Sequence, residues 1–262
     1  MPGLRDALAV ELLKARRSRV PWLVAAGLTM VPLVSGLFMF ILKDPERARQ
    51  LGLLGLKAQL TGGTADWVTY MGFIGQAVAV GGGIVFALLT AWVFGREFAD
   101  RTVRGLLAIP TARATTVTAK LLTVTLWALA MTAWVLALGY LVGLVVDMPG
   151  LSTRVVLEGT FTAGLAAVLS IGLQAGAAYF AGVGHGYLGA MAWTLLTVFA
   201  AQVLAVLGFG SWFPWSVPAL LTGAAGPGGE TVTAASYVIV AVTVMGLSVA
   251  TFRWWERTDH TG

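Results

Sequence analysis

The sequence contains no cysteine and only two histidines, His185 and His260. Without cysteine the chain can form no disulfide, no thiolate zinc site and no cysteine nucleophile. Two histidines are too few for an HExxH or a multi-histidine metal site. The sequence also lacks a GxSxG elbow and the GxxxxGK[ST] loop that cradles the phosphates of ATP. We therefore expect that the chain is not an enzyme and holds no cofactor or metal.

Charge is also scarce, because only 11% of the residues are charged while 58% are hydrophobic, with a mean hydropathy of +0.84. This composition is incompatible with a soluble globule. Six continuous apolar runs are long enough to cross a bilayer as helices, namely 20–42, 67–94, 121–146, 160–183, 187–207 and 237–254. A transmembrane β-barrel would show short alternating segments instead. We predict an all-α membrane protein with six transmembrane helices in a single domain over residues 1–262.

Lysine and arginine are distributed unevenly around these spans. Five precede the first span, five lie in the loop 95–120 and two lie at the end of the sixth span and in the tail, whereas the three segments on the opposite side hold five together. The positive-inside rule therefore predicts that both termini are cytoplasmic. The basic start resembles a signal peptide, but its apolar run is too long, so we expect an uncleaved first span. Topology explains the net charge of +5 without nucleic-acid binding.

Three segments outside the spans have distinctive patterns. Residues 3–19 place apolar and basic side chains on different helix faces, which predicts an amphipathic interfacial helix; an unstructured basic tail is the alternative. In the outer loop 43–66, Asp44-Pro45 predicts the start of a short surface helix. The outer segment 208–236 has four aromatic residues near two prolines and no basic residue. This pattern favours a re-entrant or interfacial element over an ordinary exposed loop.

The deepest strongly polar side chains within the spans are Gln76, Gln174 and Gln202. They either line a substrate pathway or bond neighbouring helices together, and general experience with membrane helices favours the second role. Glycines four residues apart, such as Gly139 and Gly143, have the spacing of close helix crossings. Such spacings also arise by chance in a chain with 33 glycines. The triplet 81–83 is expected to loosen the second span.

The loop 95–120 is densely charged and predicted to be cytoplasmic. Residues 100–109 are predicted to be helical, because Val103, Leu106 and Leu107 form an apolar face and Pro110 ends the helix. A short helix between two long spans either docks into a cytoplasmic partner or lies in the interface and assists insertion. The residues alone leave both interpretations open.

This loop is similar to the cytoplasmic segment of the ABC-2 type transporter permease family. The shared features are an acidic residue, a small–threonine pair, paired leucines, Pro-x-x-Arg and a following lysine, here Glu97, Arg101-Thr102, Leu106-Leu107, Pro110, Arg113 and Lys120. Arg101 departs from the pattern, because the family often has glycine before the threonine. The run 92–98 most resembles the bacitracin and lantibiotic self-protection branch. The six spans and their flanking elements extend the resemblance over essentially the whole chain.

The resemblance implies the membrane subunit of an ATP-driven exporter in the bacterial cytoplasmic membrane. A second permease copy, identical or a sister permease, would complete the pathway, and ABC ATPase subunits holding ATP and magnesium would drive it. The loop helix would be the coupling helix, with interface residues Glu97, Arg101, Thr102, Arg104, Leu106, Leu107, Pro110 and Arg113, the charged ones pairing across the interface. The apolar spans favour a hydrophobic or amphipathic substrate, such as a drug, a peptide antibiotic or a lipid.

Two other function classes compete with this interpretation. A secondary transporter or channel would need no ATPase, but the sequence shows no ionisable residue in mid-membrane and no inverted repeat. A non-transporting membrane scaffold would use the charged loop only for docking. Co-purification with an ATPase separates the classes.

Overall fold

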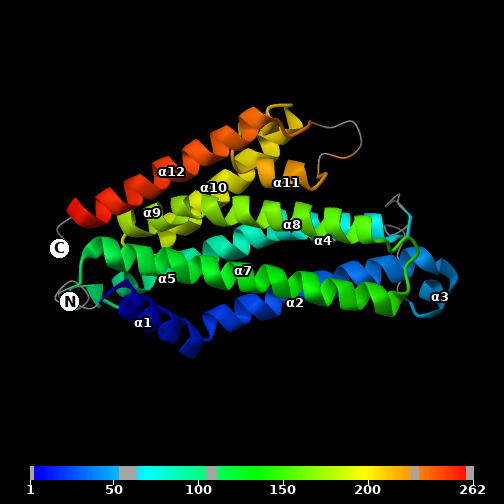
Figure 1. The fold of residues 1–262 in the computed structure, drawn as a ribbon, viewed down its shortest axis with the longest axis horizontal. Helices are drawn as coiled ribbons and strands as arrows, with labels where there is room; N and C mark the ends of the chain where they lie inside the picture. The colour runs from blue at the N-terminus through cyan, green and yellow to red at the C-terminus, as the bar shows by residue number, and fades with distance from the viewer. Residues whose placement is uncertain are drawn as a thin grey trace.

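The structure of the chain is a computed structural model that describes residues 3–52, 64–103, 105, 111–224, 226 and 230–257. All regular elements in these ranges are helical, as predicted (Figure 1). Six helical segments are long and apolar enough to cross a membrane: Val20–Lys43, Trp67–Ala99, Arg113–Val146, Thr153–Val183, Tyr187–Val206 and Ala234–Arg257. The six-span prediction is therefore confirmed.

Several helices extend beyond the apolar runs that predicted them. Helix α7 covers Arg113–Val146, so it begins eight residues before the expected span, and α8 (Thr153–Leu173) also begins early. The Ser152 side chain accepts a hydrogen bond from the backbone N–H of Val155 and caps α8. Hydropathy identifies only the residues that can lie in the hydrocarbon core of a membrane, whereas the first residue of a helix is set by capping hydrogen bonds.

The first helix, α1 (Leu4–Arg17), is formed as predicted and is not an unstructured tail. It packs against α7, and α2 (Val20–Lys43) packs along the same helix. The two ends of the chain lie at the same end of the bundle, opposite the short helix α3 (Pro45–Gln50) (Figure 1). The Asp44 side chain accepts from the backbone N–H of Arg47, so the predicted cap of α3 is present. The interfacial position of α1 stays a prediction.

Two of the spans are interrupted near their middle. In the second span, α4 (Trp67–Gln76) passes into a π-helix, η2 (Ala77–Gly82), before α5 (Gly83–Ala99). This irregularity coincides with the glycine triplet that was expected to loosen the span. In the fourth span, α8 and α9 (Ala175–Val183) are separated at Gln174. π-Helical turns often mark functional sites, so the surroundings of η2 are of interest.

The segment between α10 (Tyr187–Val206) and α12 (Ala234–Arg257) folds back onto the bundle. It contains a short turn, η3 (Gly210–Trp212), and the helix α11 (Val217–Leu221), which packs against α8 and η2. Val217 is fully buried, and Trp215 meets Trp193 of α10 edge to face at 5.4 Å between ring centroids. This segment, residues 208–233, is called the outer hairpin below. Its inward packing differs from that of an ordinary exposed loop, and its depth in a membrane stays a prediction.

Candidate functional site

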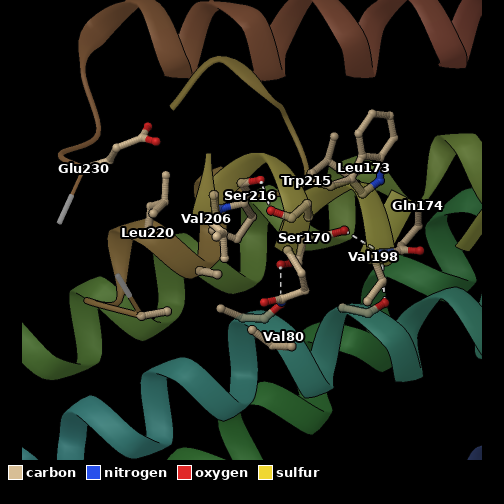
Figure 2. A pocket seen from close by; sticks show the side chains of 18 residues that line it. Val80, Ser170, Leu173, Gln174, Val198, Val206, Trp215, Ser216, Leu220 and Glu230 are labelled. Carbon is tan, nitrogen blue, oxygen red and sulfur yellow. Dashed lines mark hydrogen bonds between the residues drawn. The ribbon is translucent and has the colours of Figure 1, made fainter. Parts of the chain in front are cut away.

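A cavity of about 350 Å³ lies between the two interrupted spans, α10 and the outer hairpin (Figure 2). We refer to it as the mid-span cavity. Ala79 and Val80 line it from the π-helix, and Ser170 and Leu173 line it from the end of α8. A volume of this size is within the range of small-molecule sites. The irregular backbone of the spans therefore faces a space that a ligand can occupy.

Two side chains of the fourth span, Ser170 and Gln174, donate hydrogen bonds to backbone carbonyls of the second span where both spans line this cavity. The Ser170 hydroxyl donates to the carbonyl of Ala79 at 3.3 Å, and Gln174 Nε2 donates to the carbonyl of Gly83 at 3.2 Å. These bonds hold the two interrupted spans against each other.

The break at Gln174 arises from its own side chain. Gln174 Nε2 also donates to the Ser170 carbonyl at 2.8 Å, which is the acceptor that the Gln174 backbone N–H would use in a regular α-helix. That N–H instead bonds the carbonyl of Ile171 at 3.1 Å. The side chain thus competes with the backbone for this acceptor at the point where α8 ends, two residues after Gly172.

Glu230 ties the outer hairpin together at the other end of the cavity. Its Oε1 accepts from the backbone N–H of Gly210 at 2.9 Å, and its Oε2 accepts from that of Ser211 at 2.6 Å. The hydrogen bonds from Ser211 and Gly210 lower the pKa of the Glu230 carboxyl below its ordinary value. Glu230 is the one charged residue among the described residues that line the cavity.

The three glutamines predicted for a pathway are brought together only in part. Gln174 and Gln202 both line the mid-span cavity, whereas Gln76, at the end of α4, is not among its described lining residues. Ser170, Ser216 and Glu230 also line the cavity and were missed by the sequence reasoning. Glu230 carried a usable signal, because it is the single charged residue in 208–236.

A second polar site lies at the end of the bundle that holds both termini, next to the predicted coupling loop. Arg96 donates to Glu11 Oε2 at 2.6 Å, and Lys120 donates to Glu97 Oε1 at 2.8 Å. Lys14 also donates to Glu11, at 2.8 Å. These five residues, from α1, α5 and α7, are called the ion-pair cluster. Glu11, Glu97 and Lys120 are buried, so each needs the opposite charges around it.

The structure gives Glu97 different surroundings from those predicted. The prediction was an ion pair across a subunit interface, but the Glu97 side chain is only 3% exposed and lies at the end of α5. Its Oε1 accepts hydrogen bonds from Arg96 and Lys14 as well as Lys120. These cations belong to its own chain, and the pairing of Glu97 across an interface with an ATPase stays a prediction.

The backbone after Glu97 explains the departure noted at Arg101. Helix α5 ends at Ala99, and Arg101 has a φ of +55°, a left-handed conformation that favours glycine. The N–H of Thr102 then bonds the carbonyl of Glu97 at 2.8 Å and closes the turn. The predicted helix 100–109 therefore starts later, because Asp100 and Arg101 form the turn and helical geometry is described at residues 103 and 105.

The remaining predicted coupling residues fall into two groups. Arg113 lies in the first turn of α7, not in a loop, and donates to the carbonyls of Trp255 and Glu256 at the end of α12. A cation is favourable at the C-terminal end of a helix. Arg104, Leu106, Leu107 and Pro110 lie outside the described residues. The loop between α5 and α7 is consequently shorter than the predicted 95–120.

Two comparisons relate this chain to known proteins. A family model described as ABC-2 family transporter protein matches residues 7–201, about three quarters of the chain. The bacitracin transport permease protein BCRB of Bacillus licheniformis is 28% identical over 177 residues, which is 67% of this chain and 84% of that protein. The family match includes the ion-pair cluster and eight of the 18 described residues that line the cavity, whereas Gln202, the outer hairpin and Glu230 follow it.

Proposed function

The chain belongs to the ABC-2 family of transporter proteins and is a membrane subunit of an ABC transporter, and on this premise we propose that it is the permease of an ATP-driven exporter. Separate ABC ATPase subunits, which hold ATP and magnesium, bind the segment between α5 and α7. A second permease, identical or a sister chain, completes the complex in a bacterial cytoplasmic membrane, with both termini in the cytoplasm.

The observation that carries the coupling proposal is the ion-pair cluster. Lys120 of α7 and Glu97 of α5 flank the coupling segment on either side, and Glu11 joins α1 to both through Arg96 and Lys120. Buried, mutually bonded charges resist separation, because each loses its counter-charge if the helices part. A movement imposed on the coupling segment therefore passes to three helices together. ATP binding would then favour one arrangement of the spans over another.

The transported molecule is proposed to be hydrophobic or amphipathic. The mid-span cavity supports this, because its walls are mainly apolar and its polar groups are few. A relative named for bacitracin transport points in the same direction, since bacitracin is a peptide antibiotic. Drugs and lipids remain within the same class, and a role in drug or antibiotic resistance follows from export.

The experiment that tests the proposal is co-expression with candidate ABC ATPases, starting from the one encoded nearest to this gene. We expect one of them to co-purify and to hydrolyse ATP faster with the permease than without it. Leu107→Asp should detach this ATPase while the permease still inserts. The matched control is Leu151→Asp, the same change in a 48%-exposed leucine of the segment between α7 and α8.

Two outcomes would contradict the proposal. If no ATPase co-purifies while transport persists, a secondary transporter or channel is the better description. If Leu107→Asp and Leu151→Asp retain the ATPase equally, residues 95–120 are not the coupling site.

A further inference from the structure

The mid-span cavity is chemically different at its two ends. Figure 2 shows Gln174 at one end of the lining and Glu230 at the other. The deep end is neutral, whereas the Glu230 end carries a negative charge. The sequence 208–236 contains no lysine or arginine, so the outer hairpin supplies no cation to neutralise it.

The polar groups of the cavity are mainly acceptors. The Ser170 hydroxyl donates to the carbonyl of Ala79, and the Ser216 hydroxyl donates to the carbonyl of Ala201 at 3.1 Å. With their hydrogens engaged, both hydroxyls present only oxygen lone pairs. The Glu230 carboxylate accepts the backbone N–H groups of Gly210 and Ser211 and a side-chain hydrogen bond from Ser211, and its two oxygens offer about four acceptor positions in all. Gln202 and the indole N–H of Trp215 are the lining groups that can still offer a donor.

A carboxylate at one end of an apolar space selects for charge. An anion placed there would meet Glu230 without a compensating cation, and a neutral molecule could gain at most an ordinary hydrogen bond to it. A cation would gain a charge-assisted interaction at that end while its apolar part displaces water from the rest. Trp215 adds an aromatic face to the same lining.

We propose that the mid-span cavity binds cationic amphipathic molecules, with the apolar part between η2, α8 and α11 and the positively charged group beside Glu230. This deepens the proposed function, on which it rests for its role in export, by naming the charge of the substrate class and the place where one subunit holds it. The site lies within a single chain, so it needs no second permease to form.

Binding of probes that share one dodecyl chain tests this proposal. The purified protein in lipid nanodiscs is dialysed against labelled dodecylammonium, dodecanol or dodecanoate, and uptake by empty nanodiscs is subtracted. We expect the cation to bind about tenfold more tightly than dodecanol, a factor typical of one charge-assisted contact, and dodecanoate to bind most weakly. Absence of saturable uptake above empty nanodiscs would overturn the proposal.

Variants locate the site. Glu230→Gln should abolish the preference for the cation, whereas Asp147→Asn, which removes a 94%-exposed carboxylate away from the cavity, should preserve it. Ala219→Leu should weaken all three probes, because it fills the cavity and leaves the Glu230 hydrogen bonds in place. A cation preference that survives Glu230→Gln, or binding unchanged in Ala219→Leu, would overturn the assignment. These measurements need no ATPase, so their failure is distinct from a failure of co-purification.

Discussion

Lys120 of α7 and Glu97 of α5 are joined by a hydrogen-bonded ion pair with 2.8 Å between Nζ and Oε1, and the lysine side chain is 0% exposed. The same ammonium donates to the carbonyl of Val93 at 2.8 Å and lies 3.6 Å from Glu11 Oε2. All of its partners are therefore on other helices. A buried lysine is tolerated because these acceptors replace the water that it loses.

Lys120→Met is the first prediction. Removal of the ammonium leaves Glu11 and Glu97 sharing fewer cations in a buried site, and such a change costs about 3 kcal/mol of stability. We expect a clearly lower midpoint of thermal unfolding in detergent. The control is Arg154→Met, which breaks an exposed pair with Glu158 on α8 and should leave the midpoint unchanged. Equal effects of the two changes would contradict a stabilising role for the cluster.

The second prediction concerns the coupling of the pair. Glu97→Gln should also destabilise the protein, but the double variant Lys120→Met with Glu97→Gln should lose less stability than the sum of the two single losses. The reason is that the second change removes the carboxylate that the first left without its main partner. The unfolding midpoints of the native protein, the two single variants and the double variant form a double-mutant cycle. Strictly additive losses would show that the two residues act independently.

The spans were predictable because long apolar runs have one stable arrangement in lipid. The ion-pair cluster was not predictable, because its members come from three different helices. Glu11 and Arg96, for example, are separated by 85 positions in the sequence. The residues alone do not say which face of α1 meets α5. Glu97 was therefore expected at a surface, although it points into the bundle.

The mid-span cavity was predictable only in outline. The glycine triplet correctly indicated an irregular second span, because glycine weakens helices. The Gln174 side chain also reaches the carbonyl of Gly83, 91 residues away in the sequence, and residue identity alone does not predict this contact. Likewise, Glu230 accepts hydrogen bonds from backbone N–H groups of the outer hairpin. Every residue except proline has such a group, so the sequence does not indicate which of them Glu230 would bond.

Gly143→Ala gives the third prediction. A Cβ at this position would lie 2.4 Å from the ring of Trp67, which is itself buried, so the change forces the tryptophan or α7 to move. Overpacking of this kind costs about 1–3 kcal/mol. Gly246→Ala in α12 is the matched control, because its Cβ would meet nothing within 4 Å. A normal unfolding midpoint for Gly143→Ala would show that the contact is loose; as described, this glycine serves packing within the chain.

The fourth prediction concerns orientation. The chain has no cysteine, so single cysteines report sidedness without background. Arg257→Cys lies at the end of α12 and Leu151→Cys lies between α7 and α8. In intact cells a membrane-impermeant maleimide should label Leu151→Cys and spare Arg257→Cys until the cells are opened, because basic residues favour the cytoplasmic side. The reverse pattern would invert the topology and remove the coupling segment from the cytoplasm.

The fifth prediction follows from the lowered pKa of Glu230. A carboxyl whose pKa is lower in the folded state stabilises the protein above its ordinary pKa, here 4.5, and this contribution is lost as the pH falls through the lowered value. The midpoint difference between the native protein and Glu230→Gln should therefore be constant from pH 7 to about pH 5 and shrink below about pH 4. Asp147→Asn measured in parallel corrects for general acid effects. If the difference instead grows on acidification, the hydrogen bonds from Gly210 and Ser211 do not favour the charged carboxylate over the neutral acid.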